Sequence, residues 1–358
     1  MKKFILFFTV FCFFNNSFPN ELKYELIVDN LDVPWAFVFL PDDSILITER
    51  RGELIHFKNG IKTVVKNLPE IISKNQGGLL DIELHPNYSK NKWIYISYSS
   101  SNDKNEGTNT SILRFKLKGN QATNQEIIYK ALPNSKRNLH YGSRMVFDKD
   151  NYLFFSIGDR GNRDLNPQDI NRDGGKIYRL HDDGRIPIDN PFVNEKNSKK
   201  AIFSYGHRNP QGMFYDEKNN KIWIHEHGPR GGDEINIIEA GKNYGWPLAS
   251  YGINYIGTKF TNKTSIDGMV DPIHFWVPSI APSGMVYVDN PKYPSLNKSI
   301  LIGSLKFQYI HQSIIKDGKV IEEKKLFDQI GRVRSVELDK DKNIFVGVEN
   351  LGIIKLTE

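Results

Sequence analysis

The segment at residues 144–161, RMVFDKDNYLFFSIGDRG, contains two short apolar runs separated by a polar turn. Val, Phe, Tyr and Ile in the runs favour β-strands, and the Asp-Lys-Asp-Asn between them is typical of a turn. The segment is therefore predicted to fold as strand, turn, strand. Long stretches with helical periodicity are nearly absent from the chain, so we expect a mostly β protein.

Five other segments repeat this pattern: WAFVFLPDDSILITER from Trp35, LLDIELHPNYSKNKWIYISYS from Leu79, GMFYDEKNNKIWIHEHG from Gly212, GMVYVDNPKYPSLNKSILIGSL from Gly284 and RSVELDKDKNIFVGVEN from Arg334. Further strand-like stretches, such as GELIHF, SILRFKL, GKIYRL and DEINIIE, follow the repeats. Six similar units predict an all-β, six-bladed β-propeller. A β-sandwich or another β-fold is the alternative.

The repeats occupy one continuous region, because no Ser- or Pro-rich linker divides the chain. We expect a single propeller domain at residues 18–358. The segment YELIVDNL at residues 24–31 precedes the first repeat and is positioned to pair with the last unit and close the ring. Insertions after Gly161 and at residues 251–271 are expected at the ends of the propeller, where sites form.

The N-terminus resembles an export signal. Lys2 and Lys3 precede an apolar run from Phe4 to Phe14, which is short for a membrane span. We predict a signal peptide at residues 1–17, with an uncleaved anchor as the alternative, and a periplasmic or secreted mature protein. The single cysteine, Cys12, lies in this segment, so the mature chain would contain no disulfide.

The composition is that of an ordinary globular protein, with 39% hydrophobic and 25% charged residues among 358. The formal charge is +6, but the sequence has no long Lys/Arg run and no nucleic-acid-binding motif. Nucleic acid is therefore not expected as a partner, and the mature chain is not expected to span a membrane. The basic excess would help an anionic ligand to approach.

The stretch HGPRGGDEIN at residues 227–236 combines flexible backbone with dense charge. Glycine and proline are common in turns, so a connection between strands is one interpretation. The other is a site where backbone carbonyls approach a hard cation such as Ca²⁺. The stretch alone leaves both interpretations open.

Polar clusters next to the repeated strands favour the second interpretation. They are NQGGLLD with Gln76 and Asp81, NLHYGSRM with His140, SIGDRGN with Asp159, YGHRNPQG with His207, Arg208, Asn209 and Gln211, PSIAPSG with Pro278, Ser279 and Pro282, GSLKFQ with Lys306, and GRVRS with Arg332 and Arg334. Equivalent positions in the blades of a propeller converge, so we expect these residues at one end of the central channel.

Each residue also has a structural interpretation. His140 has the side chain of a general base, although a single histidine is more often structural. Asp159 could orient it or cap a turn. Arg332 and Arg334 are predicted on one face of a strand, where either an anionic ligand or local acidic partners would relieve their repulsion. Lys306 is predicted on an apolar strand, as a third cation near this pair.

The ordered motifs VPWAF, QGGLLDIELHP, GSRMVFD, YGHRNPQGM, EHGPRGGDEIN, AGKNYGWP and IAPSGM resemble those of the soluble aldose sugar dehydrogenases that depend on pyrroloquinoline quinone (PQQ). These enzymes are part of the glucose/sorbosone dehydrogenase group. The resemblance extends from about Leu31 to the C-terminus and implies the same six-bladed propeller.

The resemblance also implies roles for single residues. His140 would take the proton from the anomeric hydroxyl, Asp159 would support His140, and Arg208 would polarise the quinone carbonyl. PQQ would be held by Gln76, Arg208, Asn209, Lys306, Arg332 and Arg334. A calcium ion at PQQ would bind the carbonyls of Gly228 and Pro229, and a second, structural calcium would bind Glu234 and the Tyr244 carbonyl.

The implied reaction is hydride transfer from an aldose to PQQ, with a lactone as product and electrons passed to an external acceptor, which could be a quinone, a dye or a cytochrome. The protein would be a monomer or a homodimer. The alternatives are a calcium-dependent propeller lactonase or other hydrolase, which would have little use for the clustered cations, and a non-catalytic binding propeller.

Overall fold

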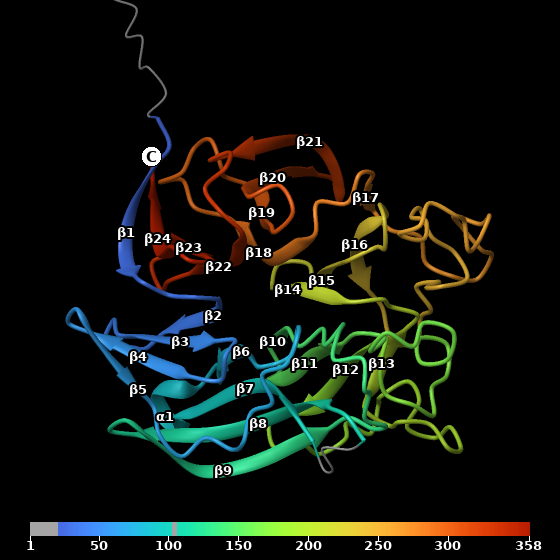
Figure 1. Ribbon diagram of the computed structural model, residues 1–358, viewed down its shortest axis with the longest axis horizontal. Helices are drawn as coiled ribbons and strands as arrows, with labels where there is room; N and C mark the ends of the chain where they lie inside the picture. The colour runs from blue at the N-terminus through green and yellow to red at the C-terminus, as the bar shows by residue number, and fades with distance from the viewer. Residues whose placement is uncertain (1–20, 102–105) are drawn as a thin grey trace, which may run out of the picture.

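The computed structural model describes residues 21–101 and 106–358, so the predicted signal peptide at residues 1–17 lies outside the described residues. The described residues form six antiparallel four-stranded sheets arranged in a ring (Figure 1). The helix α1 (Tyr88–Asn91) is a single turn between two strands. No helix in the described parts of the chain is long and apolar enough to cross a membrane.

Each sheet is one blade. Blade 1 consists of β2 (Pro34–Phe39), β3 (Ile45–Glu49), β4 (Leu54–Lys58) and β5 (Ile61–Val64). Blade 2 consists of β6 (Leu79–Leu84), β7 (Trp93–Ser100), β8 (Asn109–Lys118) and β9 (Gln121–Lys130). Blade 3 consists of β10 (Met145–Phe147), β11 (Tyr152–Ile157), β12 (Lys176–His181) and β13 (Ile202–Tyr205). Blade 4 consists of β14 (Pro210–Asp216), β15 (Lys221–Glu226), β16 (Asp233–Ile238) and β17 (His274–Trp276). Blade 5 consists of β18 (Pro282–Val288), β19 (Ser299–Ser304), β20 (Tyr309–Lys316) and β21 (Lys319–Leu326). Blade 6 consists of β22 (Val333–Leu338), β23 (Ile344–Val348), β24 (Gly352–Thr357) and β1 (Lys23–Asp29).

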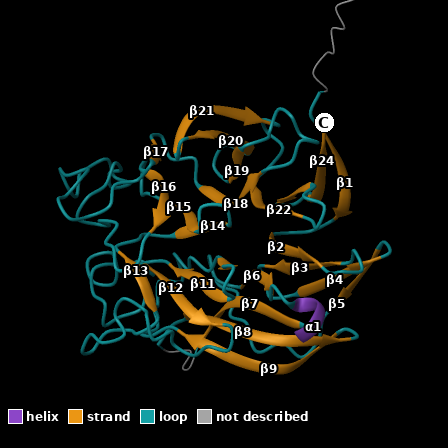
Figure 2. Ribbon diagram, turned by 180° about the vertical axis from the view of Figure 1, so that it is seen from behind, coloured by secondary structure: helices purple, strands orange, loops and turns teal. Residues whose placement is uncertain are grey.

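The first strand of each repeat lines the centre of the ring. These inner strands contact one another in the order β2, β6, β10, β14, β18 and β22, and β22 returns to β2 (Figure 1). The same six-bladed ring is seen from the opposite side in Figure 2. The prediction of an all-β, six-bladed propeller is confirmed, and the six repeats correspond to the first two strands of the six blades.

The ring closes through β1, which supplies the outer strand of the last blade. β1 pairs with β24 in antiparallel register, from Lys23 opposite Thr357 to Asp29 opposite Gly352. The pairing predicted for residues 24–31 is confirmed, and it joins the two ends of the described chain by main-chain hydrogen bonds.

The apolar side chains pack between blades. Six hydrophobic clusters lie at the six blade–blade contacts; one, for example, joins Trp35 and Leu46 of blade 1 to Leu79 and Phe115 of blade 2. A strand inside a blade is covered on both faces, so β3 (ILITE) is buried along its whole length. This packing holds the inner strands in place and so fixes the positions of the residues at their ends.

Candidate active site

A cavity of about 730 Å³ lies at the end of the channel where the inner strands begin. It brings together the following residues that the sequence analysis selected from separate blades: Gln76, His140, Arg208, Asn209, Gly228, Pro229, Lys306, Arg332 and Arg334. Gln76, His140 and Arg208 come just before β6, β10 and β14, and Arg332 comes just before β22. The inner strands of a propeller run in the same direction, so these connections meet at one end of the channel.

His140 and Asp159 form a close pair beside this cavity. His140 Nδ1 lies 2.7 Å from Asp159 Oδ1, and the side chain of Asp159 is only 2% exposed. The other carboxylate oxygen of Asp159 accepts a hydrogen bond of 3.0 Å from the Trp246 indole nitrogen. With Nδ1 held by Asp159, the Nε2 atom is the nitrogen of the His140 ring that remains for a substrate.

The surroundings keep His140 in the neutral form that a base requires. Burial lowers the pKa of His140 below its usual 6.5, and the positive charge of Arg208 lowers it further, while Asp159 opposes both. For Asp159, burial alone would raise the pKa, but the hydrogen bond and charge of His140 and the charge of Arg208 lower it overall. At neutral pH the pair is therefore a neutral imidazole beside a carboxylate.

The backbone of His140 has an uncommon conformation. Its φ angle is 52°, in the left-handed region that non-glycine residues rarely adopt. The Gln76 side-chain oxygen accepts a hydrogen bond of 2.8 Å from the His140 amide. A Cβ atom at Gly158 would collide with the His140 carbonyl oxygen, so glycine is required there for the two segments to approach. Neighbouring blades thus hold His140 in a strained position, as is common at functional sites.

Arg208 is held in place by blade 4. Its guanidinium donates to the carbonyls of His227 at 2.9 Å and Gly228 at 2.6 Å, and its amide donates to Glu226 at 2.5 Å. Glu226 also contacts His207, whose ring lies 2.8 Å away and is fully buried. His207 therefore lies beneath the site and not in it, contrary to the expectation that it faces the channel end.

Asn209 links two segments of the site by a hydrogen bond. Its side-chain oxygen accepts a hydrogen bond of 3.0 Å from the amide of Gly142, which lies two residues after His140. Asn209 thereby connects the segment before β14 to the segment before β10. The link fixes the distance between His140 and Arg208.

Arg332 and Arg334 share an acidic partner, Glu349, that the sequence analysis did not identify. Glu349 accepts 2.7 Å and 2.5 Å hydrogen bonds from them, so the local acidic partner considered for this pair is present. Arg334 is 8% exposed and Arg332 46%, and both line the cavity. Arg332 precedes β22 instead of sharing its face with Arg334. One carboxylate against two guanidiniums still leaves an excess positive charge.

Lys306 differs from its prediction. It follows β19, which ends at Ser304, and lies in an exposed turn, so it is not part of an apolar strand. Its side chain lies over the ring of Phe307 and lines the cavity. Alternation along a strand could not predict this position, because the strand ends two residues earlier.

The segment HGPRGG is shaped by Asp233. One carboxylate oxygen of this buried residue accepts hydrogen bonds from the Gly228 amide at 2.8 Å and the Ser279 hydroxyl at 2.5 Å, and the other accepts from the Ala281 amide at 2.9 Å. A Cβ atom at Gly228 would collide with the carbonyl oxygens of Gly231 and Gly232. Glycine is needed at 228 for close backbone packing, and the packing exposes Gly228 and Pro229 to the cavity.

Glu234 and Tyr244 lie behind this segment, around a cavity of about 10 Å³ that also contacts Glu226 and Gly228. Burial raises the pKa of Glu234 well above its usual value, and the charge of Glu226 raises it further. The amide nitrogen of Asn236 donates to Glu234 at 3.3 Å and to Glu226 at 3.4 Å. Two neighbouring carboxylates with so little compensating positive charge are an environment that suits one small cation.

Groups of three or more His, Cys, Asp or Glu side chains with metal-binding geometry are absent from the described residues. The ligand sets expected from the sequence contain mainly backbone carbonyls, and such sets do not form groups of this kind. The surroundings of Glu234 and of Gly228 are therefore compatible with the expected calcium ions.

Several residues of the cavity were missed. Trp35, Arg50 and Tyr255 line it, and Trp246 reaches it through Asp159. Trp35 lies in the quoted motif VPWAF and Trp246 in AGKNYGWP, so their positions in recurring motifs were a usable signal. No local pattern distinguishes Arg50 or Tyr255. Asp81, by contrast, lies deeper in the channel, paired with Arg144 at 2.6 Å.

Comparisons with known proteins show the family to which the chain belongs. The family model for glucose/sorbosone dehydrogenase matches residues 31–355. The chain is 38% identical over 335 residues to aldose sugar dehydrogenase YliI of Escherichia coli (strain K12), covering 92% of this chain and 90% of the relative.

Solved structures give the same result. The soluble aldose sugar dehydrogenase of Escherichia coli in the apo-form superposes with a TM-score of 0.90 at 37% identity, covering 94% of this chain and 99% of that one. The PQQ-bound form of aldose sugar dehydrogenase from Streptomyces coelicolor superposes with a TM-score of 0.78 at 26% identity, covering 94% and 98%.

The ring is that of the propeller dehydrogenases, which are oxidoreductases. The chain belongs to the glucose/sorbosone dehydrogenase family.

Proposed function

We propose that this protein oxidises aldose sugars at the anomeric carbon to lactones, with PQQ and calcium as cofactors and an external electron acceptor. The observation that supports this most directly is the pairing of His140 with Asp159 in a cavity that also contains Arg208, Lys306, Arg332 and Arg334. A neutral base and a group of cations are what a neutral sugar and an anionic cofactor require.

The residues present fit PQQ. The cavity of about 730 Å³ is within the range of small-molecule sites, and its cations match the carboxylates of PQQ. Gln76, Asn209, Lys306, Arg332 and Arg334 would hold the cofactor. Arg208 would lie at the reacting carbonyl, and the Gly228 and Pro229 carbonyls would bind the calcium ion beside it. When bound, PQQ supplies the quinone carbon that accepts a hydride.

The protein residues then have distinct tasks. His140 Nε2 accepts the proton of the anomeric hydroxyl. The negative charge that remains on the oxygen weakens the C–H bond of the anomeric carbon, from which the hydride leaves. Asp159 keeps the imidazole oriented and stabilises the imidazolium after proton transfer, as the carboxylate does in other His–Asp pairs. Arg208, fixed by three hydrogen bonds, offers positive charge where negative charge develops during the reaction.

Glu234 and the Tyr244 carbonyl, with Glu226 on the same small cavity, would hold the structural calcium. This ion would neutralise the buried carboxylates and stiffen the connection that supplies Trp246 to Asp159. We also propose export by the predicted signal peptide to the periplasm or the exterior, and a monomeric or homodimeric state.

The test is dye reduction by purified apo-protein with glucose and other aldoses. We expect activity when PQQ and Ca²⁺ are added together, and none when either is omitted. The His56→Gln variant is a matched control, because His56 of blade 1 bonds Ser44 of the same blade and Asn120 of blade 2, and none of the three lines the cavity.

Two results would reject the proposal. No activity on a panel of aldoses, together with no spectral change on adding PQQ, would favour a binding propeller. Hydrolysis of lactones by cofactor-free protein with Ca²⁺ would favour the hydrolase alternative.

A further inference from the structure

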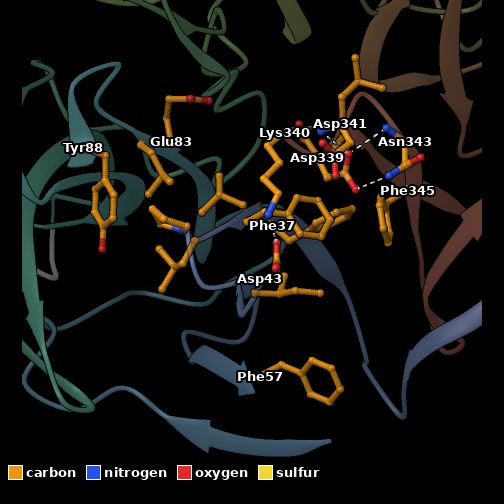
Figure 3. Close-up of a pocket in the computed structure, with 18 of the residues that line it drawn as sticks. Phe37, Asp43, Phe57, Glu83, Tyr88, Asp339, Lys340, Asp341, Asn343 and Phe345 are labelled. Carbon is orange, nitrogen blue, oxygen red and sulfur yellow. Dashed lines mark hydrogen bonds and ion pairs between the residues drawn. The ribbon is translucent and has the colours of Figure 1, made fainter. Parts of the chain in front are cut away.

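A second cavity, of about 940 Å³, lies at the opposite end of the channel (Figure 3). It is lined by residues at the ends of β2, β6 and β22, whereas the candidate active site is built where these strands begin. A six-residue strand spans about 20 Å, so the two cavities are separate sites.

Part of the wall of this far-end cavity is aromatic and aliphatic. Phe39 and Phe345 contact each other with ring centroids 4.6 Å apart, and Phe57 and Tyr88 lie on other sides of the opening (Figure 3). The cavity opens to solvent, and its lining also includes polar and charged side chains such as His85, Asn343 and Asp339. Aromatic side chains beside a set of polar groups are typical of sites for small organic molecules.

Two carboxyl groups, Glu83 of β6 and Glu337 of β22, lie at the inner boundary of the far-end cavity. Both also line a smaller cavity of about 140 Å³ that continues inward along the channel. Arg144 is 3.6 Å from Glu337 but is already paired with Asp81 at 2.6 Å. Within the described residues, Glu83 forms no ion pair with any basic side chain.

The rest of the lining compensates only part of this charge. Lys340 is paired with Asp43 at 2.7 Å, and Lys355 lies over the ring of Phe345. His85 also lines the cavity, 3.4 Å from Asp182, and burial lowers its pKa. The remaining charged groups around the opening are the carboxylates Glu25, Asp339 and Asp341. Against a formal charge of +6 for the whole chain, this region is locally acidic.

The surroundings of the two inner carboxyl groups raise their pKa values. Burial raises the pKa of Glu337 to about 8, with Arg144 opposing and Asp81 adding to the effect. Burial also raises the pKa of Glu83 well above its usual value, and the charges of Asp81 and Glu337 raise it further. A cation placed between them would reverse this effect, because it stabilises the ionised forms.

We propose that the far-end cavity binds a small organic cation, a primary amine with an aromatic or apolar group. The ammonium group would lie against Glu83 and Glu337, and the apolar group against the wall formed by Phe39, Phe345 and Tyr88. Ammonium and carboxylate are complementary in charge, and the aromatic faces suit both the cation and its apolar group. Because a nearby cation stabilises ionised carboxyl groups, the bound ammonium group would favour the charged forms of Glu83 and Glu337.

Isothermal titration of the full-length protein with 2-phenylethylamine tests this proposal. The neutral 2-phenylethanol and the anionic 3-phenylpropionate serve as matched ligands of similar shape. We expect the amine to bind with a Kd of about 1 mM or tighter and at least about tenfold better than either control. Its affinity should increase from pH 6 to pH 8, because the raised pKa values of Glu83 and Glu337 favour their uncharged forms at the lower pH.

The variant for comparison is E83Q/E337Q, which keeps the shape and removes the ionisable groups. We expect it to lose at least about tenfold in amine affinity, while dye reduction with an aldose stays unchanged and shows that the variant is folded. No binding of the amine to the wild type, equal binding of the alcohol, or full affinity in E83Q/E337Q would each overturn the proposal.

Discussion

The two ends of the channel are built from the same six strands but have opposite chemistry. At the end where the strands begin, Arg208, Arg332 and Arg334 leave an excess of positive charge around His140. At the end where they finish, Glu83 and Glu337 face a cavity with aromatic walls. A propeller fixes where side chains converge, but the residue types at each end decide which ligand is favoured.

The pairing of charges also differs between the two ends. Three arginines of the active-site end have defined partners: Glu349 for Arg332 and Arg334, and the Gly228 carbonyl for Arg208. At the far end Arg144 is shared between Asp81 and Glu337, and Glu83 has no basic partner among the described residues. We therefore expect substitutions at the first end to change catalysis and those at the second to change pH-dependent stability.

The largest effect is expected for His140→Ala. Loss of the base should lower kcat/KM for aldoses by about 10²- to 10⁴-fold. PQQ binding, followed by absorbance, should remain, because His140 is not among the cations proposed to hold the cofactor. A loss of less than about tenfold would remove His140 from the role of base, and His56→Gln is the control.

The second largest effect is expected on PQQ binding, and it should differ between Arg334 and Arg332. Arg334→Gln should weaken PQQ binding by about ten- to a hundredfold, since a buried charged hydrogen-bonding group is worth about 1.5–3 kcal/mol. Arg332→Gln should cost less than about fivefold, because its side chain is 46% exposed. Equilibrium titration of apo-protein measures both values.

A double variant tests whether the effect of Arg334→Gln comes from leaving Glu349 without this partner. Arg334→Gln leaves Glu349 buried with fewer donors, so the double variant Arg334→Gln/Glu349→Gln should recover thermal stability but not PQQ affinity. Equal affinity of the two single variants would contradict the distinction between the buried and the exposed arginine.

The pH dependence of catalysis should be moderate. Because burial and Arg208 lower the pKa of His140, kcat/KM should be constant near neutral pH and fall about tenfold per pH unit below a pKa that is under 6.5. Asp159 raises the pKa of His140, so Asp159→Asn should move this acid limb to lower pH as well as slow the reaction. A limb that moves to higher pH would show that Asp159 does not stabilise the imidazolium.

The smallest effect on catalysis is expected at the far end. Glu337→Gln should leave aldose oxidation unchanged but alter stability. The pKa of Glu337 is about 8 in the folded state against 4.5 as the usual value, so its contribution is fully present below about pH 4.5 and is lost as pH rises through 8. Urea midpoints measured between pH 5 and 9 should fall less steeply in Glu337→Gln than in the wild type. An equal slope would show that the pKa of Glu337 is not raised in the folded state.

The fold was predictable because its signal repeats along the chain. Six strand–turn–strand segments and a preceding strand at residues 24–31 were enough to predict six blades and their closure, which the pairing of β1 with β24 confirms. The cations and His140 were also found from the sequence, since they occur next to the repeated strands. Their gathering in one cavity follows from the direction of the inner strands.

Other features were beyond the reach of sequence patterns. Glu349 and Trp246 reach their partners at separations of 15 and 87 residues, and Arg50 and Tyr255 belong to no recognisable motif. His207 shares the motif YGHRNPQG with Arg208, yet it is fully buried below the site. Adjacent residues of one motif thus have different environments, which depend on packing between blades.

The sequence by itself determined the number of blades, the closing strand and most of the residues around the candidate active site. It could do so because strand periodicity and motif order are local properties. Only the tertiary structure decided which charges are paired, how strongly burial alters the pKa values of His140 and Glu337, and that a second cavity exists at the far end. Those properties depend on distances between side chains from different blades, and the closing of the ring sets these distances.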